Sequence, residues 1–258
     1  MNEKKENVVI SRIEDAVVKQ DRLYFFDFYD EAMQVKIETF LKKSKAHYIL
    51  DGGFPDAARK MLCVIPADWM TFLDPETDIE WPMMAVRFPR TFTFAHRHVL
   101  GTLMGLGIEH KCIGDINLDE KECQVIFDEK IYPFLKNEFV AIRGRRIQPE
   151  FFDYPHIRSF TLKTKKMVIT VNSPRIDAVI DRIWGISRQT AEAAVRQSRV
   201  RVNYAEILKK DFAVKPGDII SFRGKGKAKI ADFIGKSKKG KIQIQVEKYL
   251  WSTIQQNK

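Results

Sequence analysis

The positive charge of this chain is confined to its last third, which constrains what that part can fold into. Residues 171–258 contain 19 Lys and Arg against 8 Asp and Glu, a net charge of +11. Residues 1–170 contain 25 against 26, a net charge of −1, so the formal charge of +10 for all 258 residues arises from the last third. A compact basic segment on a neutral body is typical of a module that binds a polyanion such as nucleic acid.

Composition and hydropathy exclude several other classes of protein. Hydrophobic residues make up 45% of the chain and charged residues 30%, which is typical of a globular protein. The longest apolar stretch, Val99 to Ile108, is about half the length that a membrane span requires, and the N-terminus lacks the apolar segment of a signal peptide. Three cysteines (Cys63, Cys112 and Cys123) are too few and too widely spaced for a disulfide framework or a metal knuckle. We therefore expect a cytoplasmic protein that holds no metal.

The basic segment is patterned as a folded domain rather than as a solubilising tail. Ser173 followed by Pro174 is a typical helix start, and apolar residues at i, i+3, i+4 and i+7 follow it. We expect Gly185 to end this helix and Ser187 to cap a second one that runs to about Arg196. The residues expected to face the core are Ile176, Val179, Ile180, Ile183, Ala191, Ala194 and Val195.

Beyond the second helix the pattern changes to that of strands. Val200 and Val202 alternate with arginines, which predicts a strand with one buried face. The Lys-Pro-Gly-Asp turn at 215–218 leads into a second expected strand, 219–223. Residues 224–241 alternate Lys with Gly, which is typical either of a flexible loop that follows a phosphate backbone or of a solvated hairpin loop.

This run of elements resembles the S4 RNA-binding domain. The matching segments are RIDAVID (175–181), ISRQTAEAAV (186–195), RVRVNY (199–204) and VKPGDIISFRG (214–224). The resemblance implies an αL-like pair of short helices that, with the strand and loop that follow, holds structured RNA.

The chemistry of the basic residues agrees with this resemblance. Guanidinium groups bind phosphate oxygens in a bidentate fashion, and a cluster of them recognises RNA by shape and backbone more than by base. We expect Ser187 to cap a helix first and to contact RNA through backbone amides second, and Asp177 and Asp181 to orient neighbouring arginines. The candidate RNA contacts are Arg175, Arg182, Ser187, Arg188, Arg196, Arg199, Arg201, Asn203, Lys225, Lys227 and Lys238.

The first 75 residues are expected to form a helical or mixed subdomain. Residues 11–46 have a helical pattern, and residues 48–66 predict a strand, a turn at Gly52–Gly53, a short helix and a second strand. The glycine pair is compatible with a simple turn or with a backbone nest for phosphate, but no Lys-Ser or Lys-Thr follows it. A P-loop is therefore excluded.

The middle of the chain predicts the order strand, helix, strand, strand, helix, strand. The expected elements are strand 79–88, helix 95–107, strand 112–117, strand 123–127, helix 128–138 and strand 160–171. This is the ferredoxin-like or RRM-like β-α-β-β-α-β arrangement. The third strand, 122–127, lacks the stacking aromatics of RNA-binding RRMs, so we assign no base stacking to it.

The start of the first of these helices offers a candidate second RNA contact. His96 and His98 are two residues apart and cannot chelate one ion from a helix, whereas His96 and Arg97 could contact a phosphate there or have a structural role.

This helix, the Gly-Gly block and the basic domain together resemble the YlmH family of bacterial S4-domain proteins. The markers are His96-Arg97-x-Val99-Leu100-Gly101, Leu106-Gly107-Ile108, Ile113-Gly114-Asp115-Ile116, SFRGKGKAKI (221–230) and GKSKKGK (235–241). Members typically carry an acid where this chain has His98. The resemblance implies RNA binding on the large ribosomal subunit, contacts of the S4 domain with ribosomal RNA and tRNA, and a part in ribosome-associated quality control of stalled peptidyl-tRNA.

The sequence therefore predicts an α+β protein with three parts. They are an N-terminal helical or mixed subdomain (1–75), an RRM-like domain (76–171) and an S4 domain (172–245).

The favoured function is that of a non-enzymatic, ribosome-associated RNA-binding protein with no catalytic residues, cofactor, small-molecule substrate or membrane partner. One alternative is an RNA-modifying enzyme related to pseudouridine synthases with a degenerate motif. Its nearest string, Gly114-Asp115-Ile116-Asn117, lacks the arginine that would pair with the acid. A second alternative is a protein-interaction scaffold.

Overall fold

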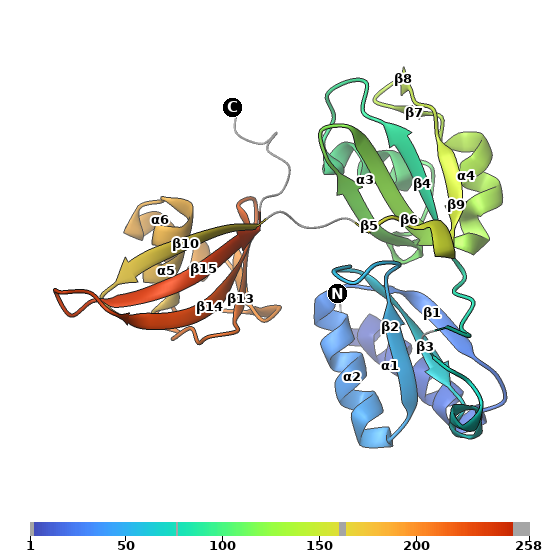
Figure 1. The fold of residues 1–258 in the computed structure, drawn as a ribbon, viewed down its shortest axis with the longest axis horizontal. Coiled ribbons are helices and arrows are strands. Elements are labelled where there is room, and N and C mark those ends of the chain that lie inside the picture. The colour runs from blue at the N-terminus through green and yellow to red at the C-terminus, as the bar shows by residue number, and fades with distance from the viewer. Residues whose placement is uncertain (1–2, 76, 160–163, 250–258) are drawn as a thin grey trace. The chain divides into compact units, whose positions relative to one another are not determined.

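The computed structural model describes residues 3–75, 77–159 and 164–249, and the chain divides into two compact units, Met1–Phe160 and Thr161–Lys258 (Figure 1). The architecture is mixed α+β with several antiparallel sheets, as the sequence predicts. In the part of the chain that is described, no helix has both the length and the apolar character needed to span a bilayer.

The first part of unit 1 is a three-stranded sheet with two helices. Its elements are α1 (Glu3–Lys19), β1 (Tyr24–Tyr29), α2 (Glu31–Ser44), β2 (His47–Asp51), β3 (Lys60–Ile65) and the 3-10 turn η1 (Ala67–Thr71). The strand order is β1-β3-β2. One face packs against α1 and α2 through residues such as Phe26 and Leu62, and the other contributes Phe28 and Met61 to a second core. Because both faces are covered, β3 is an almost unbroken apolar run.

Two sequence predictions for this part are wrong. Residues 11–46 are not one helix, since β1 interrupts them with the run YFFDFY, whose aromatic residues favour a strand. Residues 52–59, predicted to contain a short helix, form turns instead. The Gly53 N–H donates to the Asp51 carboxylate (2.5 Å), so this amide is occupied and the simple turn, not the phosphate nest, describes the glycine pair.

The second part of unit 1 is a four-stranded sheet in the order β5-β6-β4-β9. Its elements are β4 (Met83–Pro89), α3 (His96–Gly105), η2 (His110–Cys112), β5 (Ile113–Leu118), β6 (Glu122–Asp128), η3 (Glu129–Ile131), α4 (Tyr132–Glu138), a small hairpin of β7 (Ala141–Ile142) and β8 (Arg145–Arg146), β9 (Glu150–Asp153) and η4 (Tyr154–His156). Helices α3 and α4 pack on one face, around Val99, Leu103 and Leu135.

The last strand of this sheet differs from the prediction. The sequence predicted it at 160–171, but β9 occupies that place and pairs with β4. Residues 164–171 form β10 (Thr164–Val171), which pairs instead with β15 of unit 2, and residues 160–163 lie outside the described residues. Because β9 has only four residues, its pattern is too short to stand out in the sequence.

The face of this sheet opposite the helices is covered by the chain itself. The fully buried Gln124 of β6 donates from Nε2 to the Arg158 carbonyl (3.0 Å), and its Oε1 accepts the Arg158 N–H (3.2 Å). Ile157 and Tyr154 pack against the core that contains Ile126. Segment 154–159 therefore occupies part of the surface that an open sheet would offer to a ligand.

Arg59 and Asp115 join the two parts of unit 1. The Asp115 carboxylate accepts the N–H groups of Ala58 (2.7 Å) and Arg59 (3.0 Å). The Arg59 guanidinium donates to the carbonyls of Phe28 (2.9 Å) and Ile113 (2.7 Å) on strands of different sheets. Burial raises the pKa of Asp115 and lowers that of Arg59, so both charges depend on these bonds for compensation.

Unit 2 is a six-stranded sheet with a helix pair. Its elements are β10, α5 (Ile176–Trp184), α6 (Arg188–Arg196), β11 (Val200–Val202), β12 (Ala205–Glu206), β13 (Ile219–Phe222), β14 (Gly226–Lys236) and β15 (Ile242–Tyr249), and the strand order is β10-β15-β14-β13-β11-β12 (Figure 1). All seven residues predicted to face the core are buried. Gly185 ends α5 in the left-handed conformation (φ 62°), and the Ser187 hydroxyl accepts the Thr190 N–H (3.1 Å) to cap α6, both as predicted.

The flexible loop considered for 224–241 is largely wrong. Residues 226–236 are strand β14, which pairs with β13 and β15. The buried Ala228 and Ile230 supply an alternating apolar pattern that the many lysines and glycines obscure. The hairpin loop is confined to Ser237–Lys241, where the Ser237 N–H donates to the Lys241 carbonyl (2.8 Å).

The Arg59–Asp115 connection makes a testable prediction about stability. We expect D115A to lower the free energy of unfolding by about 2–4 kcal/mol, because two backbone N–H groups lose their acceptor and the buried Arg59 guanidinium loses a nearby negative charge. D56A is the matched control, since Asp56 is exposed in the same loop, and we expect it to change stability by less than about 0.5 kcal/mol. Urea denaturation of both variants measures this; equal effects would show that the carboxylate does not join the two parts.

Candidate nucleic-acid interface

A buried carboxylate organises the basic surface of unit 2. Asp177, in the first turn of α5, has 0% of its side chain exposed and lies between two arginines. Arg175 pairs with it in a bidentate fashion, with Nε 3.2 Å from Oδ1 and Nη2 2.9 Å from Oδ2. Arg188 donates from Nε (3.2 Å) and Nη2 (2.9 Å) to the same Oδ2. The hydrogen bonds to Asp177 raise the pKa of Arg175, so the carboxylate fixes both guanidinium groups in position.

The two arginines open onto a pocket of about 260 Å³. Arg182 of α5 also lines it, seven residues after Arg175, which caps the start of this helix. The Asp181 carboxylate lies 3.4 Å from Nε of Arg182. The remaining lining residues are Thr170, Val171, Asn172, Ser173, Ala178, Asp181 and Lys241.

Lys241 is the pocket residue that the sequence did not predict. Strand β10 pairs with β15 in a register that sets Val171 opposite Ile242. The residue before Ile242 thus meets the connection between β10 and α5, although 70 positions separate it from Val171. Only this pairing of distant strands places Lys241 at the pocket. The sequence shows a lysine-rich run there, from which it predicts Lys238 as the RNA contact.

The other predicted contacts of the helices and of β11 do not line the pocket. Arg196 is exposed at the end of α6, and Arg201 forms an ion pair with Glu206 at 3.2 Å. Arg199 lies over the Phe222 ring, 5.7 Å from its centroid. Both polar atoms of the Asn203 side chain are occupied, with Nδ2 donating to Asp218 (2.8 Å) and Oδ1 accepting the Ile219 N–H (3.0 Å). This amide therefore stabilises a turn.

The three predicted lysines lie in or next to strand β14. Lys225 precedes β14, and its carbonyl accepts a hydrogen bond from Nε1 of Trp184 (3.0 Å). Lys227 lies over the Tyr204 ring, 5.6 Å from its centroid. Lys238 is exposed in the hairpin loop.

The candidate second contact belongs to unit 1. His96 begins α3, Arg97 is exposed beside it, and Nδ1 of His98 accepts the Ala95 N–H (3.0 Å). Burial, and secondarily the charge of His110, lowers the pKa of His96. Among the described residues, no group of three or more His, Cys, Asp or Glu side chains could hold a metal ion.

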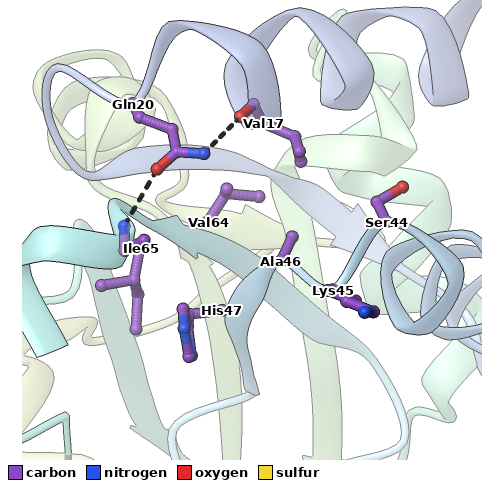
Figure 2. A pocket seen from close by; sticks show the side chains of 9 residues that line it. Val17, Gln20, Ser44, Lys45, Ala46, His47, Val64 and Ile65 are labelled. Carbon is purple, nitrogen blue, oxygen red and sulfur yellow. Dashed lines mark hydrogen bonds between the residues drawn. The ribbon is translucent and has the colours of Figure 1, made fainter.

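A second pocket, in the first part of unit 1, is too small for a ligand. Its volume is about 40 Å³, enough for only a few water molecules. Figure 2 shows Gln20 at its rim, where Nε2 donates to the Val17 carbonyl (3.0 Å) and Oε1 accepts the Ala67 N–H (3.1 Å). Both polar groups of the Gln20 side chain are thus used within the protein.

Comparison with known proteins gives a family match within unit 1 and a curated relative along most of the chain. Residues 75–154 match the family described as "Putative RNA-binding domain in YlmH". A curated Bacillus subtilis (strain 168) protein, "Ribosome-associated protein quality control protein P2", is 28% identical over 234 residues, which cover 90% of each chain. The resemblance to the YlmH family is confirmed.

The family match covers the four-stranded sheet of unit 1 and the helices α3 and α4. It ends at residue 154, directly after β9 and ahead of β10. A solved structure with the description "Cell division protein ylmH from Streptococcus pneumoniae" aligns with a TM-score of 0.45 at 19% identity, covering 59% of this chain and 89% of that one.

The buried carboxylate makes a second testable prediction. We expect D177N to lower the free energy of unfolding by about 2 kcal/mol, because the amide replaces one acceptor oxygen by an N–H donor that faces the guanidinium groups, and it removes the negative charge between them. E192Q is the control, since Glu192 pairs with Arg188 and Lys210 at the surface (3.9 and 3.0 Å) and should contribute less than about 1 kcal/mol. Thermal and urea unfolding distinguish the two, and an equal loss in both variants would contradict the role given to Asp177.

Proposed function

We propose that this protein is a non-enzymatic RNA-binding protein and that unit 2, as an S4-like domain, holds structured RNA by its phosphates. The observation that carries the proposal is the group of Arg175, Arg182, Arg188 and Lys241 around one pocket. Guanidinium groups held in place by Asp177 lose little further freedom on binding phosphate, which favours affinity. The sugar–phosphate backbone of folded RNA presents the matching acceptors.

We further propose that the RNA is ribosomal RNA of the large subunit, tRNA or both, in quality control of stalled peptidyl-tRNA. The B. subtilis relative, whose name places it in ribosome-associated quality control, aligns over 90% of both chains. An alignment of that length extends well into unit 2, which begins at Thr161.

The domain organisation belongs to the same proposal. The strand order β5-β6-β4-β9, with α3 and α4 on one face, supports an RRM-like middle domain. The pairing of β10 with β15 supports an S4-like domain that begins with β10.

Outside the pocket, we propose flanking RNA contacts at Ser187, Arg196, Arg199, Arg201, Asn203, Lys225, Lys227 and Lys238 and a second contact at His96 and Arg97.

Charge reversal tests the proposal. We expect R182E/R188E to weaken binding of large-subunit ribosomal RNA or tRNA by at least about tenfold and to reduce co-sedimentation with ribosomes. K209E/K215E is the matched control, because both lysines are exposed in unit 2 and neither lines the pocket. Wild-type affinity should fall by about 0.7–0.9 log units per phosphate contact for each log unit of salt.

Two outcomes would contradict the proposal. An RNA affinity that does not change with salt concentration would exclude a phosphate clamp, that is, the binding of RNA phosphates by the basic residues of the pocket. Wild-type co-sedimentation of R182E/R188E would favour the protein-interaction scaffold, in which unit 1 makes the decisive contacts.

The structure also bears on the enzyme alternative. Asp115, the acid of the string nearest to a pseudouridine-synthase motif, uses both carboxylate oxygens to accept backbone N–H groups. An acid committed in this way is poorly placed to attack a base. We expect mass analysis of tRNA and ribosomal RNA incubated with the protein to show no new modification, and any modification that depends on Asp115 would overturn the binding-only function.

A further inference from the structure

We propose that the pocket of unit 2 takes one ribonucleotide of the bound RNA, with its phosphate on the arginines and Lys241 and its ribose 2′-hydroxyl on Asp181. This inference rests on the proposed function and adds to it a defined subsite. It replaces a diffuse basic surface with a concave site that distinguishes RNA from DNA.

The shape of the site supports a nucleotide rather than a lone phosphate. The volume of about 260 Å³ is many times what one ion or water needs. The walls come from four elements: the end of β10, one face of α5, the start of α6, and the Ser237–Lys241 loop after β14.

The donors available for a phosphate are defined by what Asp177 leaves unused. It takes Nε and Nη2 of both Arg175 and Arg188. No described residue accepts a hydrogen bond from Nη1 of either side chain, although both line the pocket. Each Nη1 carries two N–H donors, so two fixed guanidinium groups, with Arg182 and Lys241, can surround one phosphate.

The carboxylate of Asp181 indicates that the ligand carries a hydrogen-bond donor as well as a phosphate, as a nucleotide does. An acid on the wall of an otherwise basic pocket repels a phosphate, so a ligand made only of phosphate groups gains nothing from it. Its side chain is 17% exposed, and the nearest described cation, Nε of Arg182, is 3.4 Å away. A ribose 2′-hydroxyl supplies a donor for this carboxylate close to the phosphate, and the 2′-hydroxyl is the group by which proteins distinguish RNA from DNA.

Lys241 gives the first test, because the same hairpin offers a matched control. We expect K241Q to weaken binding of the full-length chain to large-subunit ribosomal RNA or tRNA by about fivefold and to reduce the salt slope by about one unit. K239Q removes an equally exposed charge two residues away that does not line the pocket, and its effect should be smaller. Equal effects of the two variants would overturn the pocket.

Asp181 gives the second test. We expect the four ribonucleoside 5′-monophosphates to compete with the bound RNA better than their 2′-deoxy counterparts and better than inorganic phosphate at the same ionic strength. D181A should lower the ribo-to-deoxy preference about tenfold, which corresponds to one hydrogen bond to a charged group. D181N keeps an acceptor without the charge and should preserve part of the preference.

The outcomes separate this inference from the proposed function. If the wild-type chain binds RNA but shows no ribo-to-deoxy preference, or keeps it unchanged in D181A, the nucleotide site is wrong and the phosphate clamp stands. If the wild-type chain binds neither large-subunit ribosomal RNA nor tRNA, the proposal that unit 2 holds RNA by its phosphates is wrong. Calorimetry with the monophosphates then tests the pocket directly, and absence of binding overturns it too. Equal thermal midpoints of K241Q, D181A and wild type exclude misfolding as the cause.

Discussion

The basic surface of unit 2 depends on one buried carboxylate. Asp177 holds Arg175 and Arg188 with hydrogen bonds of 2.9–3.2 Å, and these arginines come from the starts of two different helices. Without it, two positive charges would lie close together with nothing between them. A carboxylate removed from water is costly unless it is paired in this way, so the acid and the arginines stabilise one another. The same interaction thus holds the two helices together and fixes the guanidinium groups of Arg175 and Arg188.

What the sequence could predict follows from how local each feature is. The apolar stripe of α5, the end of that helix at Gly185 and the cap at Ser187 depend on residues within a few positions, and all three are confirmed. The pairing of β10 with β15 joins segments about 70 residues apart. No local pattern specifies such a partner, so the middle sheet received the wrong last strand and Lys241 was missed. Long-range register is the information that a single sequence expresses most weakly.

Unit 1 is organised to be rigid rather than open. Arg59 and Asp115 connect its two sheets through four backbone groups and each other's charge. Gln124 holds segment 154–159 against the sheet face opposite α3 and α4. In an RRM that face would stack bases; here a buried amide bound to the chain's own backbone takes part of the space. That part of the sheet face is therefore closed to base stacking.

Two aspartates four residues apart on α5 illustrate why net charge alone describes this surface poorly. Asp177 is fully buried and serves the arginines from behind, whereas Asp181 remains partly exposed on the wall of the pocket. A uniformly basic pocket would bind any polyanion that fits, because phosphate attraction carries no information about the sugar. An acid in the same pocket weakens that general attraction. It favours only a ligand that can donate a hydrogen bond to the carboxylate. In the proposed subsite, specificity for RNA would therefore come from Asp181, the residue that lowers the positive charge.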